Sequence, residues 1–140
     1  MSFSFDPAGP LPTAILFLAH LGLCVAYIQG GLVKLTDFPG AIAEMTQFRL
    51  TPPALFAVLV IVLELGASAL VMTGYLRWLG ALTLAGFTLL STLIALRFWE
   101  RPKGQDRHAA ANAFFEHLGL AGGFLLVIWL DLARNSSANL

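Results

Sequence analysis

The chain has 140 residues and a formal net charge of zero, and 58% of its residues are hydrophobic while only 11% are charged. A typical globular domain carries about 25% charged residues, so a soluble domain of this length could not bury so much apolar surface. The absence of a basic excess argues against nucleic acid as a partner. Cys24 is the single cysteine, which excludes an internal disulfide and a cysteine-based metal site.

Four stretches are long and apolar enough to cross a membrane. A hydrocarbon core of about 30 Å needs roughly 20 helical residues, and the sequence predicts spans at about 11–33, 53–73, 76–99 and 112–130. The first stretch lacks a basic region and a small-residue cleavage site, so we expect it to be retained rather than removed as a signal peptide. A soluble four-helix bundle would need a polar stripe on each helix, and Leu76–Leu96 has none. The predicted fold is therefore all-α, a single integral-membrane four-helix bundle over residues 1–140.

The connections between the spans define two sides of the bundle. Gly74 and Tyr75 leave only a tight turn between the second and third spans, while the other two connections are longer. We call the side with these longer connections the loop side and the opposite side, which carries both termini, the terminus side. In the first long connection, Asp37-Phe38-Pro39-Gly40 resembles a helix start. The apolar residues that follow at helical spacing predict a short interfacial helix: Phe38, Ile42, Met45 and Phe48.

The distribution of basic residues predicts the orientation of the bundle. Lysine and arginine near helix ends favour the cytoplasmic side of a membrane. Arg77 and Arg134 belong to the terminus side. The loop side carries Lys34, Arg49, Arg97, Arg101, Lys103 and Arg107. We therefore expect a cytoplasmic loop side and both termini outside.

Two ionisable residues lie deep in the predicted spans, where such groups are costly and usually functional. His20 is about 12 Å below the terminus side when counted from Pro12, and Glu64 is about 13 Å below it when counted from Thr73. This equal depth predicts a hydrogen bond or ion pair between His20 and Glu64. A structural role for such a pair remains an equally good alternative.

A second group of polar residues lies near the loop side and predicts a polar cleft entered from there, with His20 and Glu64 at its floor. Arg97 and Glu116 are at similar depth, so pairing between them would offset the cost of a charge in lipid. The group consists of Gln29, Lys34, Arg97, Glu116 and His117. Snorkelling to the headgroups is the alternative for Lys34 and Arg97. The depths of His20 and His117 differ too much for shared haem ligation, and the sequence shows no metal motif.

The sequence resembles the DoxX family of small bacterial membrane proteins along nearly its whole length. The similar segments are Gly31-Leu32-Val33-Lys34-Leu35 with Phe38-Pro39-Gly40, Glu64-Leu65-Gly66 with Gly74 and Arg77, and Leu118-Gly119 with Gly122-Gly123-Phe124-Leu125-Leu126. Two positions depart from the family pattern. Ala67 stands where a second glycine is common, and Glu116-His117 stands where many members have a lysine-asparagine pair, which replaces a base by an acid.

The resemblance implies a multi-pass protein of the bacterial cytoplasmic (inner) membrane. Some members of the family are the membrane subunit of a thiosulfate:quinone oxidoreductase, and others join redox-defence complexes. By this analogy the cleft would bind a quinone, with no covalently bound cofactor. His20 and Glu64 would exchange protons, and Lys34 or Arg97 would polarise a carbonyl. A partner subunit would supply electrons, since so short a chain is not expected to be a complete oxidoreductase. The alternatives are a non-catalytic assembly subunit and a small carrier of hydrophobic ligands.

Overall fold

The computed structural model describes residues 9–138, and this part of the chain is helical without any strand. Four helical segments are long and apolar enough to cross a membrane. They are α1 (Pro10–Thr36), α3 (Pro53–Thr73), α4 (Arg77–Ala95) with the following short helix η1 (Phe98–Glu100), and α5 (Gln105–Ala138). A shorter helix, α2 (Phe38–Gln47), joins α1 to α3. The all-α fold with four spans is thus confirmed.

Local sequence signals set several of the helix ends. Pro10 occupies the first turn of α1, where proline costs a helix least because no backbone N–H is needed there. Asp37 caps α2, since its Oδ1 accepts a hydrogen bond of 3.1 Å from the N–H of Gly40. Gly74 ends α3 with a left-handed φ of 82°, which glycine adopts at little cost. The short turn predicted after the second span follows from that glycine.

The second long connection is shorter than the sequence predicted. The helix α4 ends at Ala95, and η1 completes the span to Glu100. The last span was expected to begin near residue 112, but α5 begins at Gln105, directly after Gly104. Hydropathy identifies only the apolar part of a helix. The helix can extend past that part into charged residues such as Asp106 and Arg107. The connection expected over residues 100–111 is therefore reduced to residues 101–104.

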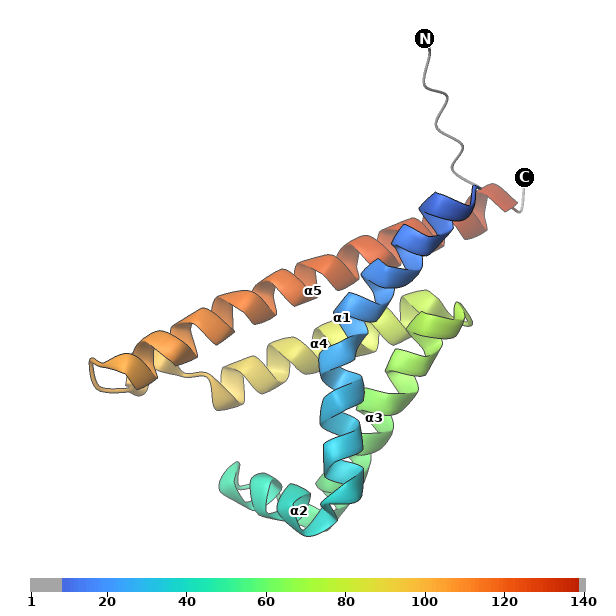
Figure 1. Cartoon of the computed structure of the whole chain (residues 1–140). Coiled ribbons are helices and arrows are strands. Elements are labelled where there is room, and N and C mark those ends of the chain that lie inside the picture. The colour runs from blue at the N-terminus through green and yellow to red at the C-terminus, as the bar shows by residue number, and fades with distance from the viewer. Residues whose placement is uncertain (1–8, 139–140) are drawn as a thin grey trace.

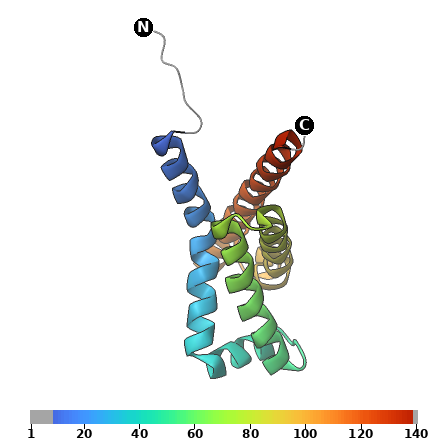
Figure 2. The ribbon, with the colours of Figure 1, turned by 90° about the vertical axis from the view of Figure 1, so that its right-hand side faces the viewer.

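The long helices form two antiparallel pairs that cross at a large angle (Figure 1). One pair is α1 with α3, and the other is α4 with α5. The two pairs approach each other toward the terminus side and diverge toward the loop side, where α2 and the α4–α5 connection lie far apart. The view in Figure 2 shows α1 and α3 side by side, with α5 running from behind them toward the upper right.

The main apolar core lies where the two pairs cross. Its largest fully buried side chains are Phe124, Leu84 and Val71, one each from α5, α4 and α3. The helices α3 and α4 come especially close at Gly80, where a Cβ would lie only 2.7 Å from the carbonyl oxygen of Ala67. This contact holds the two pairs together and leaves the loop side open.

A second, smaller core lies beneath α2. Ala41 and Met45 of α2 are buried together with Ala57 of α3, and Phe38 and Ile42 pack against them. Three of the four residues of the predicted apolar stripe therefore belong to this cluster. By packing on α3, the short helix brings Glu44 close to the space between the helix pairs.

Candidate functional site

An open pocket of about 520 Å³ lies between the two diverging helix pairs. All five α-helices contribute to its wall, which is mainly apolar and includes Phe48, Phe56 and Phe87. A few polar side chains are set into this wall: Tyr27, Lys34, Glu44, Glu64, Thr88, Ser91 and His117. Apolar walls with a small number of placed polar groups are typical of sites for small molecules, and this volume falls in their usual range.

The pocket contains a buried ion pair between α1 and α3. The Nζ of Lys34 lies 3.3 Å from Oε2 and 3.4 Å from Oε1 of Glu64. The exposed fractions of the two side chains are 15% and 7%. The same Nζ lies 4.0 Å from Oε2 of Glu44 on α2. The ammonium group of Lys34 therefore lies within ion-pair distance of two carboxylates, one inside the membrane span and one on the connecting helix.

Two glycines on α1 make room for this ion pair. A Cβ on Gly30 would lie 3.4 Å from Oε1 of Glu64, and a Cβ on Gly31 would lie 2.7 Å from Cγ of Leu65. The absence of side chains at these positions lets α3 pack directly on the backbone of α1. Gly31, which lies in a segment that resembles the DoxX family, thus sets the depth at which Glu64 meets α1.

A chain of hydrogen bonds forms the opposite wall. The hydroxyl of Tyr27 is hydrogen-bonded to that of Thr88 on α4. One turn further along α4, Oγ1 of Thr92 is 2.7 Å from Nδ1 of His117 on α5. Thr88 and Thr92 were not among the site residues predicted from the sequence. Their signal was present, because two threonines spaced by four residues in an apolar helix share one face.

The predicted pairing of His20 with Glu64 is wrong. Because Gly31 is level with Glu64 and Leu65, His20 lies eleven residues along α1 from that level, about 16 Å toward the terminus side. The prediction assumed that α1 and α3 begin and end in the same planes. In fact α1 has 27 residues and α3 has 21, and the two helices cross. The floor of the pocket therefore does not include His20.

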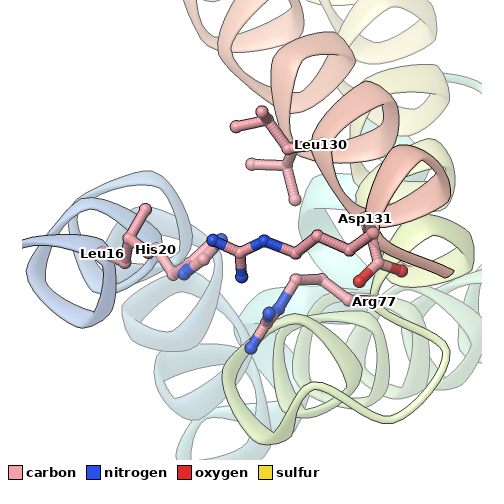
Figure 3. Close-up of a pocket in the computed structure, with 7 residues that line it drawn as sticks. Leu16, His20, Arg77, Leu130 and Asp131 are labelled. Carbon is pink, nitrogen blue, oxygen red and sulfur yellow. The ribbon is translucent and has the colours of Figure 1, made fainter. Parts of the chain in front are cut away.

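His20 belongs to a separate cluster on the terminus side (Figure 3). It lies with Arg77, Asp131 and Arg134 around a small cavity of about 20 Å³. The Oδ2 of Asp131 accepts a hydrogen bond of 3.1 Å from the N–H of Trp78 and so caps the start of α4. The Nε of Arg77 donates to the carbonyl oxygen of Val71, 2.9 Å away, at the end of α3. These bonds give the cluster a structural role in joining α3, α4 and α5.

Two other predicted site residues lie outside the pocket. Arg97 does not pair with Glu116. Its Nη1 lies 3.4 Å from Oε1 of Glu100, and both side chains are about half exposed. Glu116 is exposed on the outer face of α5, whereas its neighbour His117 is partly buried and lines the pocket. Adjacent residues on a helix point about 100° apart, so the two cannot share one face. Of the predicted residues, the pocket brings together Lys34, Glu64 and His117.

The fold and the pocket define a small multi-pass membrane protein with an ion-paired site between its helices. The chain belongs to the DoxX family, because the DoxX family model matches residues 15–97, more than half of its length. It is similar to the inner membrane protein YphA of Escherichia coli strain K12, with 26% identity over 125 residues that cover 89% of this chain and 86% of YphA. No solved structure matches the chain. These relationships establish a multi-pass protein of the bacterial cytoplasmic membrane.

Proposed function

We propose that the pocket between the helix pairs binds the ring of a membrane quinone and that the chain serves as the membrane subunit of a redox complex. The observation that carries this proposal is the buried Lys34–Glu64 pair facing an apolar pocket of about 520 Å³. Ionisable groups inside a membrane protein usually mark a pathway for protons or a site for a ligand. A quinone combines a polar, proton-exchanging ring with an apolar tail, and both parts match this wall.

Two exposed side chains in the pocket wall also fit a ligand with a long tail. The lining residues Leu59 and Leu90 are 51% and 60% exposed on the outer faces of α3 and α4. A tail that leaves the pocket beside them would pass directly into the bilayer. The ring would then lie near Lys34, Glu64 and His117, and a partner protein would exchange electrons with it.

Binding of a short-chain quinone analogue tests this function. The full chain, purified in lipid nanodiscs, should bind the analogue in at least one redox state. Glu64→Gln should weaken this binding about tenfold, which corresponds to the loss of roughly 1.4 kcal/mol from one charged contact. Glu116→Gln makes the same chemical change outside the pocket and should leave binding unchanged. The proposal fails if neither redox state binds, with or without co-purified partners, or if the two variants behave alike.

A second candidate, a non-catalytic accessory subunit, is favoured by glycines on the outer helix faces. Within residues 9–138, a Cβ on any of these glycines would meet no atom beyond its own stretch of helix within 4 Å: Gly22, Gly66, Gly86, Gly119 and Gly122. Such faces let a helix of another protein approach closely. This role predicts stable co-purification with a partner and an activity of the complex that survives Glu64→Gln.

A further inference from the structure

The hydrogen atoms in the polar wall of the pocket can be assigned one by one, because each hydroxyl group carries only one. The Oγ1 of Thr88 lies 2.6 Å from the carbonyl oxygen of Leu84. A carbonyl oxygen cannot donate, so the single hydroxyl hydrogen of Thr88 is used there. The hydrogen bond between Tyr27 and Thr88 must then be donated by Tyr27. The phenol oxygen of Tyr27 is left with lone pairs only.

The same count fixes the tautomer of His117. The Oγ1 of Thr92 lies 2.6 Å from the carbonyl oxygen of Thr88, which takes its only hydrogen. Thr92 must therefore accept its second hydrogen bond, of 2.7 Å, from the N–H at Nδ1 of His117. A neutral imidazole carries one N–H, so Nε2 of His117 presents a lone pair. In this tautomer, Nε2 is the ring nitrogen left for a ligand in the pocket that His117 lines.

The other polar groups of the wall are acceptors as well, with the exception of Lys34, whose ammonium group can only donate. The hydroxyl of Ser91 donates to the carbonyl oxygen of Thr88 over 3.1 Å. The carboxylate of Glu64 accepts from Lys34, whose Nζ is placed between Glu64 and Glu44. Among residues 9–138, the polar groups that line the pocket thus offer a ligand mainly lone pairs. A ligand that also offers only lone pairs would leave them unsatisfied.

We infer that the pocket selects a ligand that donates hydrogen bonds through ring hydroxyl groups, and hence the reduced quinol in preference to the oxidised quinone. This inference rests on the proposed function and deepens it. A hydroquinone carries two hydroxyl groups that can donate to acceptors such as Nε2 of His117 and the carboxylate of Glu64. A quinone has carbonyl oxygens in the same places and can only accept. Sites built around a substrate hydroxyl discriminate strongly against analogues that lack it.

Three ring compounds with the same short alkyl tail test the inference on the full chain in lipid nanodiscs, with oxygen excluded. They are the 1,4-hydroquinone, its dimethyl ether and the 1,4-quinone. We expect the hydroquinone to bind at least tenfold more tightly than either of the others. If the quinone or the ether binds as tightly as the hydroquinone, the inference is overturned and the proposed function stands. If none of the three binds, the proposed function fails and the inference with it.

Variants of the hydrogen-bond chain test its physical basis. Thr92→Val removes the acceptor that holds the N–H at Nδ1, so the proton can move to Nε2 and the hydroquinone-to-ether affinity ratio should fall several-fold. His117→Leu should lower the same ratio. Thr83→Val is a matched control on α4, because within residues 9–138 the Thr83 hydroxyl donates only to the carbonyl oxygen of Leu79 in its own helix, over 2.8 Å, and the ratio should not change. The ratio within each variant is independent of the folded fraction. A ratio unchanged in both Thr92→Val and His117→Leu would overturn the inference.

Discussion

At the residue scale, the pairing of Lys34 with Glu64 offsets the free-energy cost of placing charged groups inside the membrane. Each side chain is mostly buried, and an isolated charge there would be strongly unfavourable. Lys34 also lies near the loop-side end of α1, two residues before Thr36. From that position its long side chain reaches back along the helix to the level of Glu64, which is the reverse of snorkelling toward the headgroups.

Breaking this ion pair from the lysine side should destabilise the protein. Lys34→Met leaves the Glu64 carboxylate buried without its partner, which should cost roughly 3 kcal/mol. The double variant Lys34→Met/Glu64→Gln should recover most of that loss, because neither charge remains. The midpoint of thermal unfolding in detergent measures both effects. Arg97→Met, which breaks a half-exposed ion pair, should change it little. Purely additive losses in the double variant would contradict the expected coupling.

The sequence identified residues that line the candidate pocket better than it identified the partners of those residues. Lys34, Glu64 and His117 stand out because they are ionisable groups in apolar stretches, and composition alone reveals this. Their pairing depends on helix crossing and on the reach of each side chain, which a count of depth from the helix ends omits. Thr88 and Thr92 remained hidden because threonine is common in membrane helices and often bonds to its own helix.

At the element scale, hydropathy determines where the helices lie in the sequence, and glycines at the helix contacts determine how closely the helices pack. The four spans were predictable because roughly 20 apolar residues in a row permit only a membrane helix. The start of α5 was not predictable, because its first turn is charged and carries no apolar pattern that would mark it as part of the helix. The close approach of α3 and α4 at Gly80 was also not predictable, because Gly86 looks the same in the sequence, yet a Cβ added there would meet no other part of the described chain within 4 Å.

The two glycines of α4 should therefore respond in opposite ways to alanine. Gly80→Ala would place a methyl group against the backbone of α3, 2.7 Å from the oxygen of Ala67, and should lower stability by about 1–3 kcal/mol. Gly86→Ala has open space around it and should be neutral or stabilising by up to about 1 kcal/mol, because alanine is the better helix former. Thermal unfolding of the two variants in detergent gives the comparison. Equal losses in both would show that helix contact is not the cause.

At the scale of the whole molecule, the two helix pairs are joined at one end and open at the other. The core at the crossing and the hydrogen bond from Arg77 of α4 to the carbonyl oxygen of Val71 of α3 hold the two pairs together on the terminus side, while the pocket occupies the loop side. The excess of lysine and arginine on the loop side predicts that this open end faces the cytoplasm. A cytoplasmic partner would then meet the end at which the helix pairs diverge.

Cysteine labelling measures this orientation. Lys103 in the α4–α5 connection and Ser136 near the end of α5 are both exposed, and the natural Cys24 is fully buried. A membrane-impermeant maleimide added to intact bacterial spheroplasts should label Ser136→Cys and spare Lys103→Cys. Breaking the cells open should make both react. Labelling of Lys103→Cys in intact spheroplasts would reverse the predicted orientation.

The exposed leucines of the pocket wall, Leu59 and Leu90, have a consequence for how such a site would be filled. A ligand that passes between them arrives from the lipid phase, so the quantity that governs occupancy is its mole fraction in the bilayer and not its concentration in water. A bilayer concentrates lipophilic molecules, and a modest intrinsic affinity is then enough for high occupancy. Adding empty lipid vesicles to a saturated sample should consequently dilute the ligand and empty the pocket, even though the total amount of ligand is unchanged.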